Sequence, residues 1–194
     1  YIRTVYDNII YRDIIARYAI RKQKVVKELV NILASNISSR FTYNSLRKSL
    51  GLSNAITVKE HVSYLSNSYL FFELLKFDFS VKRQLNSPRK IYMIDPAFSR
   101  IAGMGMSPDK GKVLENIVFV ELKRMGKEIY YYSGAGECDF LLKEGARISE
   151  ALQVCYELNE SSRQRELTGL LEAMDKFKLK RGIILTREQD EDIT

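Results

Sequence analysis

Apolar residues change from a helical to a strand-like spacing close to residue 70, and this change limits the folds open to the first half of the chain. Three short helical stretches come first, at residues 25–36, 42–50 and 57–70. Three runs typical of strands follow, at residues 69–75, 77–80 and 90–94. Three helices, then a β-hairpin with a basic loop at residues 82–89, is the order of a winged helix. We therefore expect a winged-helix module over residues 23–105, preceded by a linker helix over residues 1–22.

Local signals predict where these helices begin and end. Thr42 is a favoured N-cap residue, and Gly51 follows the second helical stretch. The quartet Thr57-Val58-Lys59-Glu60 has the form of a capping box, in which the hydroxyl and the carboxylate each satisfy a backbone N–H. Residues 1–21 repeat apolar side chains at helical spacing, which predicts one amphipathic helix.

A winged helix binds DNA through its third helix, which enters the major groove, and through its wing, which contacts phosphates. The residues that these two elements would present are Thr57, Lys59, His61 and Tyr64 on the helix and Lys82, Arg83, Arg89 and Lys90 on the wing. The alternative is a packing or dimerisation module whose hairpin arginines are simply solvated. His61 is the one histidine of the chain and fits a surface or helix-packing position better than a catalytic one.

Charge is divided unevenly along the sequence. Residues 1–110 carry 18 Lys and Arg against 8 Asp and Glu, a net charge of +10, whereas residues 111–194 carry 13 against 16, a net of −3. A basic first half favours DNA as a partner, with the affinity mainly in that half. Surface lysines that keep a protein in solution would give the same balance.

Cysteine and hydropathy patterns exclude several classes of protein. Cys138 and Cys155 are the two cysteines, and with a single histidine they predict neither a zinc site nor a disulfide framework. No apolar run reaches the roughly 20 residues of a membrane helix. We expect a reduced, cytoplasmic protein without a membrane partner. The start at Tyr1 and the acidic end at residues 188–192 suggest an internal part of a longer protein.

The second half has a different order of elements. Residues 103–108 are rich in Gly and Met and end in Ser107-Pro108, a favoured helix start, so they predict a linker and then a helix. The expected elements are a helix at 109–125, strands at 128–132, 137–142 and 148–156, a helix at 162–177 and a strand at 182–186. This α-β-β-β-α-β order defines a second domain over residues 106–194 and makes the whole chain an α/β protein.

Four positions in this domain form an incomplete two-carboxylate site. Glu115 lies on the first expected helix and Asp139 on the second strand, while Gln153 and Cys155 are two apart on the third strand and so face the same way. The pattern resembles the PD-(D/E)XK nuclease signature, which has a helix Glu, a strand Asp and then Glu-x-Lys. A phosphodiester nuclease needs oxygen ligands for a divalent ion and a cation that stabilises the developing negative charge.

The whole chain also resembles the C-terminal region of a prokaryotic, especially archaeal, family of AAA-type ATPases. The segments that carry this likeness are residues 90–95 (KIYMID), 114–122 (LENIVFVEL), 136–140 (GECDF) and 153–158 (QVCYEL). Family members have a P-loop ATPase domain ahead of this region, so the resemblance implies an N-terminal ATPase domain in the same polypeptide, and a homo-oligomer is possible for such a protein. The chain has no Gly-x-x-x-x-Gly-Lys-Ser/Thr motif, so it has no ATP site of that kind.

By this resemblance Glu115 and Asp139 are metal ligands, Gln153 replaces a Glu as a neutral ligand, and Cys155 stands where the lysine is expected. The implied Mg²⁺ or Mn²⁺ would be weakly bound, because an amide oxygen brings no charge. A thiol with a pKa near ~8.5 cannot replace an ammonium at pH 7. Candidate substitute cations are Lys143, Arg163, Arg165 and Lys176, and Glu121 is an alternative helix carboxylate. Otherwise the carboxylates are relics that cap turns or pair with cations.

We therefore expect the C-terminal targeting or DNA-binding part of an AAA-type ATPase, with a degenerate nuclease-like domain that is weakly active or inactive. One alternative is a metal-dependent DNA endonuclease with a relocated basic residue. The other is a protein-interaction module for ATPase assembly, which a broad apolar face on residues 1–21 would favour.

Overall fold

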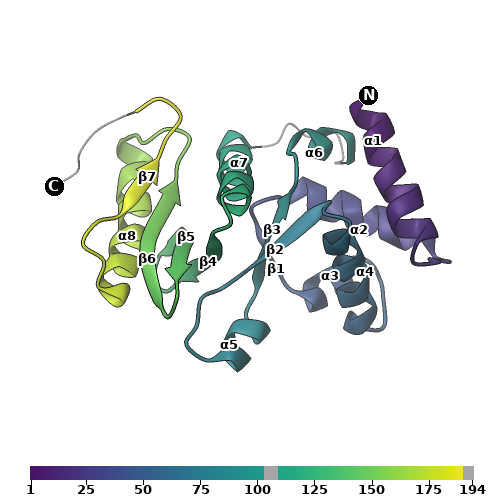
Figure 1. The fold of residues 1–194 in the computed structure, drawn as a ribbon, viewed down its shortest axis with the longest axis horizontal. Helices are drawn as coiled ribbons and strands as arrows, with labels where there is room; N and C mark the ends of the chain where they lie inside the picture. The colour runs from purple at the N-terminus through teal and green to yellow at the C-terminus, as the bar shows by residue number, and fades with distance from the viewer. Residues whose placement is uncertain (103–108, 190–194) are drawn as a thin grey trace. The chain divides into compact units, whose positions relative to one another are not determined.

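The computed structural model describes residues 1–102 and 109–189 as a mixed α/β chain with two separate sheets (Figure 1). Backbone contacts divide the chain into two compact units. The first unit comprises Tyr1–Glu73 and Pro88–Asp109, and the second comprises Leu74–Ser87 and Lys110–Thr194. This division differs from the expected domains, because residues 74–87, expected in the wing, group with the second half. The expected linker at 103–108, its Ser107-Pro108 helix start and residues 190–194 lie outside the described residues.

The first unit combines helices with a small sheet of strand order β1-β3-β2. Its helices are α1 (Ile2–Asn8), the π-helix η1 (Ile9–Ala16), α2 (Gln23–Ser35), α3 (Tyr43–Ser49), α4 (Ala55–Asn67) and α6 (Ala97–Ala102). Its strands are β1 (Arg40–Phe41), β2 (Phe71–Leu75), which continues into the second unit, and β3 (Arg89–Met93), which pairs antiparallel with β1. The core is built from fully buried aliphatic side chains such as Val26, Leu29, Val58 and Leu65.

The structure tests three expectations for the helices of this unit. The side chain of Thr42 accepts from the Ser45 N–H and caps α3 as expected, and Gly51 has a positive φ of 63° just after that helix. The expected capping box at Thr57 is wrong: α4 begins at Ala55, and Asn54 caps it by accepting from the Ile56 N–H. The single helix expected at residues 1–21 is α1 followed by a π-helix that ends at Ala16.

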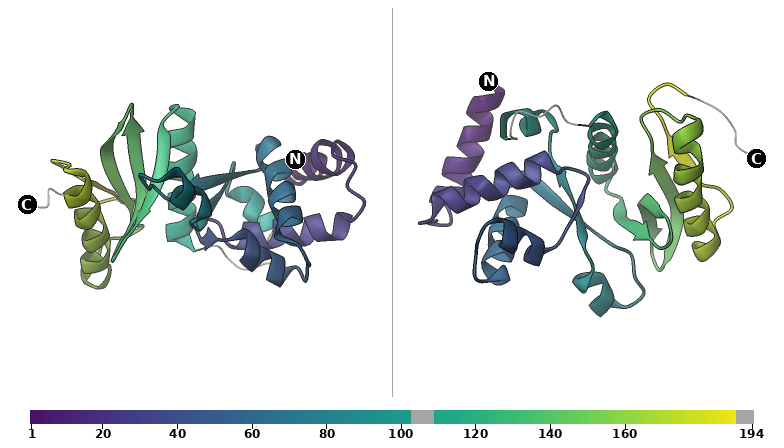
Figure 2. Two further views of the ribbon diagram at one scale, coloured as in Figure 1. Left: turned by 90° about the horizontal axis from the view of Figure 1, so that it is seen from below. Right: turned by 180° about the vertical axis from the view of Figure 1, so that it is seen from behind.

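The second unit is a four-stranded sheet of order β4-β5-β6-β7 with a helix on each face (Figures 1 and 2). Its elements are α5 (Val81–Asn86), α7 (Lys110–Arg124), β4 (Glu128–Ser133), β5 (Glu137–Glu144), β6 (Arg147–Val154), α8 (Glu160–Phe177) and β7 (Ile183–Leu185). Strands β4, β5 and β6 are antiparallel neighbours, and β7 is parallel to β6. The expected α-β-β-β-α-β order of residues 109–186 is confirmed.

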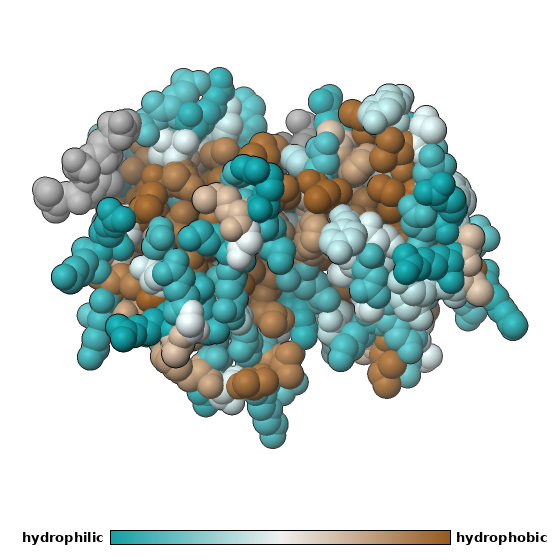
Figure 3. Space-filling view, viewed as in Figure 1, coloured by the Kyte–Doolittle hydropathy of each residue, from teal (hydrophilic) through white to brown (hydrophobic). Residues whose placement is uncertain are grey.

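The segment expected to form the wing is folded differently. Instead of a strand at 77–80 and a basic turn, the Phe77 N–H donates to the Tyr131 carbonyl of β4 at 2.8 Å, and Val81–Asn86 form helix α5. Phe77 packs edge-on against Tyr130 and Phe177. Aromatic packing therefore fixes this segment within the second unit. The segment also carries the exposed apolar residues Phe79, Val81 and Leu85. Apolar surface is visible at the lower edge of Figure 3, in the region of α5.

Helix α8 packs against the sheet through close backbone contact and one carboxylate. A Cβ on Gly136 would lie 2.6 Å from the Gly169 Cα, and a Cβ on Gly169 would lie 1.9 Å from the Glu137 carbonyl oxygen. Glu172 accepts hydrogen bonds from the N–H groups of Gly136 (2.7 Å) and Ala135 (3.1 Å) and from the Tyr132 hydroxyl (2.8 Å). These contacts fix the start of β5, which leads to the candidate site.

Candidate functional site

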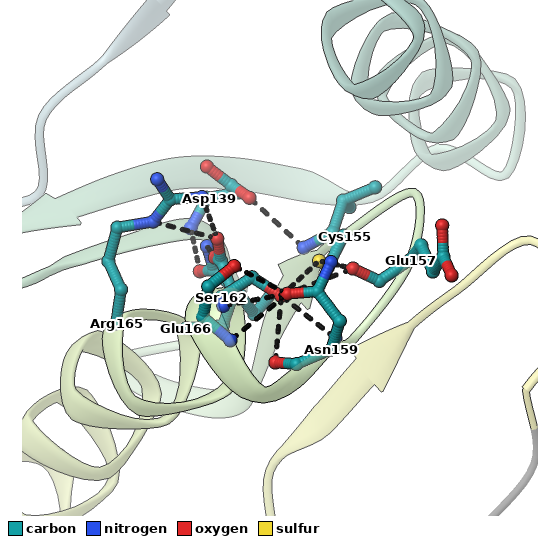
Figure 4. A network of polar contacts seen from close by, with 10 residues as sticks. Asp139, Cys155, Glu157, Asn159, Ser162, Arg165 and Glu166 are labelled. Atoms are coloured by element: carbon teal, nitrogen blue, oxygen red, sulfur yellow. Dashed lines mark hydrogen bonds and ion pairs between the residues drawn. The ribbon is translucent and has the colours of Figure 1, made fainter.

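A chain of hydrogen bonds around Gln153 joins β5, β6 and α8. Figure 4 shows Asp139, Arg165 and Glu166 of this network close together. The side-chain oxygen of Gln153 accepts from the Asp139 N–H at 3.1 Å, and its amide nitrogen donates to Glu166 Oε2 at 2.5 Å. Asp139 Oδ2 accepts from the Val154 N–H at 3.0 Å. All three side chains are buried, with 5–6% of each residue exposed. Because both ends of the amide have partners of the right polarity, its orientation is fixed.

Arg165 adds a positive charge to this network. Its guanidinium donates twice to Glu166 Oε1, at 3.0 and 2.5 Å. The hydrogen bonds and charge of Glu166 raise the pKa of Arg165, and the nearby Cys155 and Asp139 add smaller contributions in the same direction. The buried carboxylate is thus paired by a side chain that is itself largely exposed. Arg165 therefore brings a cation close to Asp139 without occupying the strand position expected for the lysine.

Cys155 lies directly after β6 and meets the first turn of α8. Its thiol donates to the Glu157 carbonyl at 3.1 Å and lies 3.9 Å from Ser162 Oγ. Asn159 caps α8 by accepting from the N–H groups of Ser161 and Ser162, and the Ser162 hydroxyl accepts from the Asn159 N–H. The expected lysine position thus holds a buried thiol that bridges a loop and a helix start.

A bulge in β5 sets the position of Asp139. Tyr132 pairs with Cys138 and Tyr130 with Leu141, so β5 has one residue more than β4 between these pairs. Such an extra residue bends a strand and redirects its side chains, and bulges are common beside functional sites. On the other side, Phe140 pairs with Leu152 of β6, which places Asp139 beside Gln153.

The expected metal ligands Glu115, Asp139 and Gln153 lie on α7, β5 and β6. Glu115 is buried on α7, whereas the Gln153 side chain is bonded to α8 on the opposite face of the sheet (Figure 2). Within residues 1–102 and 109–189, no group of three or more His, Cys, Asp and Glu side chains is arranged to hold a metal ion. The Gln153 oxygen already accepts from the Asp139 N–H, and binding of Mg²⁺ or Mn²⁺ by these residues stays a prediction.

The expected substitute cations have separate positions. Lys143 forms an ion pair with Glu128 at 2.8 Å, and the Lys176 ammonium lies 4.7 Å from the centre of the Tyr132 ring. Arg163 lies in the first turn of α8, one residue after Ser162. The alternative carboxylate Glu121 is exposed and paired with Arg124 at 2.6 Å. Arg165 is bonded directly to the network, through Glu166.

Glu166 is a residue of the network that the sequence patterns do not predict. It shares a buried stripe of α8 with Gly169, Leu170 and Ala173. Residues three, four and seven positions apart lie on the same face of a helix, so Glu166 faces the same way as these three residues. That placement was the available signal, since a buried acid requires a partner.

The predicted DNA-reading residues of α4 differ in exposure. Lys59 is exposed, Thr57 lies within the first turn and is half-buried, and His61 is half-buried, which lowers its pKa. Tyr64 is covered, because its ring stacks on Tyr18 at 3.9 Å between centroids. Lys59 is thus the predicted α4 contact that is most available to a phosphate.

Two of the four predicted wing residues are internal. Arg89 pairs with Glu73 at 3.1 Å and stacks on the Tyr43 ring at 4.7 Å, while Lys90 is only 2% exposed. The expectation that these two line an exposed loop is therefore wrong. Burial raises the pKa of Glu73, and the Tyr43 hydroxyl donates to it at 2.8 Å. Lys82 and Arg83 lie on α5, where Lys82 is exposed and Arg83 binds both oxygens of Asp78.

The apolar face expected on residues 1–21 is also partly internal, since Ile10, Ile14 and Ile15 of η1 are buried in the first unit. In the described part of the chain, no helix has the length and apolar character needed to cross a membrane.

A family model described as a domain of unknown function, DUF8612, matches residues 1–109. The chain belongs to the DUF8612 family. The matched region ends at Asp109, which is also the last residue of the first unit. The network around Gln153 therefore lies outside the DUF8612 match, in the second unit.

Two curated proteins resemble nearly the whole chain. An uncharacterized protein of Methanocaldococcus jannaschii, MJ1544, is 35% identical over 182 residues, which cover 89% of this chain and 40% of that protein. An uncharacterized protein of Haemophilus influenzae is 25% identical over 179 residues, covering 90% of this chain and 44% of that protein. The chain thus spans less than half the length of these curated relatives. No solved structure matches the chain.

Proposed function

We propose that this chain is the DNA-binding part of a longer AAA-type ATPase, and that its nuclease-like domain is weakly active or inactive. Three observations support the proposal: the sequence segments that resemble such ATPases, the net charge of +10 over residues 1–110, and the greater length of the two curated relatives. ATP binding would then belong to a separate domain of the longer protein.

In this proposal the first unit is a winged helix and the second is a PD-(D/E)XK-like domain. The helices α2, α3 and α4 followed by strands β2 and β3 support the first assignment. The order α7-β4-β5-β6-α8-β7, with Asp139 and Gln153 on adjacent strands, supports the second. Lys59, Lys82 and Arg83 are exposed predicted DNA contacts, and Arg83 is paired with Asp78. Arg89 and Lys90 act inside the first unit.

The hydrogen bonds of Gln153 carry the proposal of weak or absent cleavage. Its oxygen already accepts from Asp139 and its nitrogen donates to Glu166, so the amide links three elements instead of facing a substrate. Cys155 supplies no positive charge at the expected lysine position. Loss of one positioned electrostatic stabiliser lowers a rate by roughly 10²–10³. Cleavage should therefore be undetectable or very slow.

Cleavage of a labelled duplex with Mg²⁺ or Mn²⁺ tests this proposal. We expect no cutting above that of Asp139→Asn, and a gain in the double variant Cys155→Lys with Gln153→Glu that Asp139→Asn removes. Circular dichroism must first show that the variants fold. Efficient cutting by the unmodified chain that Asp139→Asn abolishes would contradict the proposal.

A second candidate function is phosphodiester cleavage in which Arg165 replaces the missing lysine. The observation that favours it is the position of Arg165, which is bonded to Glu166 and close enough to Asp139 for their charges to interact. In this case Arg165→Ala should reduce Asp139-dependent cutting by about 10²–10³, while Lys143→Ala, which alters a pair on the sheet edge, should leave it unchanged.

A further inference from the structure

The parallel strands β6 and β7 end side by side, and Lys110 at the start of α7 lies close to these ends. Val154 of β6 pairs with Leu185 of β7, and the Cys155 N–H donates to the Leu185 carbonyl at 2.9 Å. Tyr156 and Arg187 therefore follow neighbouring strand ends.

A cation from each of two elements meets the ring of Tyr156. The Lys110 ammonium, at the first residue of α7, lies 5.5 Å from the ring centre, and the Arg187 guanidinium lies 5.5 Å from it as well. Arg187 also hydrogen-bonds the Tyr156 hydroxyl. Each contact is a cation–π interaction, which favours a charge beside the ring. We refer to Lys110, Tyr156 and Arg187 as the Tyr156 cluster.

Two like charges gathered around one ring repel each other, and an anion beside both would offset that repulsion. One carboxylate is already present, since Glu188 pairs with Arg187 at 2.8 Å. Glu188 is mostly exposed and holds one guanidinium nitrogen, so it competes for Arg187. Lys110 and Arg187 are both exposed to solvent and thus accessible to a ligand.

The cluster is adjacent in sequence to the candidate site. Tyr156 follows Cys155 directly and lies three residues beyond Gln153. A DNA strand near Asp139 and Cys155 would continue past the end of β6, where its next phosphates would meet the cluster. Arginine and lysine are the side chains that most often contact such phosphates.

We propose that Lys110 and Arg187, held around Tyr156, bind the phosphodiester backbone of DNA at the ends of β6 and β7. This inference rests on the proposed DNA-binding function and names a contact surface for it in the second unit, outside the DUF8612 match. Glu188 is an internal competitor that weakens this contact. The second unit then contributes to affinity although residues 111–194, which form most of it, carry a net charge of −3.

Equilibrium binding of a fluorescent duplex by the full chain, measured over a salt series, tests the inference. Each phosphate contact contributes about 0.9 to the slope of log affinity against log salt. We expect Lys110→Gln with Arg187→Gln to lower the slope by about 1.8. The control Lys123→Gln with Lys180→Gln removes the same charge from exposed positions of the same unit and should leave the slope nearly unchanged.

Removal of the competing negative charge of Glu188 supplies an independent test, because it should strengthen DNA binding instead of weakening it. Glu188→Gln should tighten DNA binding at fixed salt. The control Asp175→Asn makes an equal charge change at an exposed position near the C-terminal end of α8 and should tighten binding less. If the unmodified chain binds but both cluster variants match their controls, the Tyr156 cluster is not a DNA contact and the proposed function still stands. Absence of binding by the unmodified chain at low salt would contradict both proposals.

Discussion

The side-chain amide nitrogen of Gln153 lies 2.5 Å from a carboxylate oxygen of Glu166. The two residues are complementary: an amide donor at position 153 matches an acceptor at position 166. A glutamate at position 153, as the nuclease signature has it, would bring two carboxylates together in a buried place. A glutamine at position 153, in place of the glutamate of the signature, therefore suits the Glu166 carboxylate, because it can donate a hydrogen bond to it.

Gln153→Glu should destabilise the second unit by about 1–3 kcal/mol at pH 7, because it removes a hydrogen bond and places like charges in contact. The loss should shrink towards pH 4, where one carboxyl of such a pair takes up a proton. Urea unfolding followed by circular dichroism at both pH values measures this.

The exchange variant Gln153→Glu with Glu166→Gln is the matched control. It reverses donor and acceptor, leaves an amide oxygen for Arg165, and should recover most of the lost stability. If Gln153→Glu alone is as stable as the unmodified chain at pH 7, the bond between Gln153 and Glu166 has no energetic importance.

Gly169→Ala should destabilise the second unit by about 1–3 kcal/mol through overpacking. The added Cβ would meet the backbone of Glu137, which is part of β5 and cannot rotate away as a side chain can. Thr168→Ala, one residue earlier at an exposed position of the same helix, should change stability by no more than about 0.5 kcal/mol. Equal effects of the two variants would exclude the close packing of α8 on β5 as the cause.

The order of elements in residues 109–186 could be predicted from the sequence because each element has a clear period and is bounded by turn residues. The start of α4 could not, since Asn54 and Thr57 are both good caps and tertiary packing decides between them. Residues 82–86 have turn-like composition, yet they form α5 beside Phe77, which packs against aromatic side chains more than 50 residues ahead. Patterns among residues that are close in the sequence do not reveal contacts between segments that are far apart in it.

The candidate site could be predicted in its strand positions and not in its helix positions. Asp139, Gln153 and Cys155 are located by strand alternation and the motif resemblance. Glu166 joins them only because α8 folds back over β6, a relationship between segments 13 residues apart that no local motif marks. Arg89 and Lys90 were misplaced for a similar reason, since Glu73 and Tyr43 draw Arg89 inward.

Glu172→Gln should reduce stability at neutral pH and have little effect in acid. Hydrogen bonds from the Gly136 N–H, the Tyr132 hydroxyl and the Ala135 N–H lower the pKa of Glu172 below its ordinary value. Such a carboxylate adds stability that is fully present above the unfolded pKa of about 4.3 and is lost as pH falls through the lower folded pKa. Urea unfolding at pH 7, 5 and 3 should show the two proteins converging at pH 3. A constant difference over that range would mean that the loss comes from packing and not from charge.

Arg89→Ala should lower the stability of the first unit by about 1–3 kcal/mol, because it leaves the Glu73 carboxylate without its cation. Lys82→Ala, at an exposed position, should change stability by less than about 0.5 kcal/mol and should weaken DNA binding with a slope change of about 0.9. Thermal unfolding and the salt series, applied to both variants, separate the two roles. An unaltered melting temperature in Arg89→Ala, together with weaker DNA binding, would restore Arg89 as a phosphate contact.

The central claim is that the chain binds DNA and does not cut it efficiently, and one measurement tests this most directly. The unmodified chain and Asp139→Asn are each incubated with a fluorescent duplex and Mg²⁺ at low salt. Fluorescence anisotropy reports binding, and the length of the DNA strands reports cleavage in the same samples. We expect both proteins to bind with the same affinity, to lose affinity as salt rises, and to leave the duplex intact. Asp139-dependent cutting, or no rise in anisotropy at low salt, would contradict the proposed function.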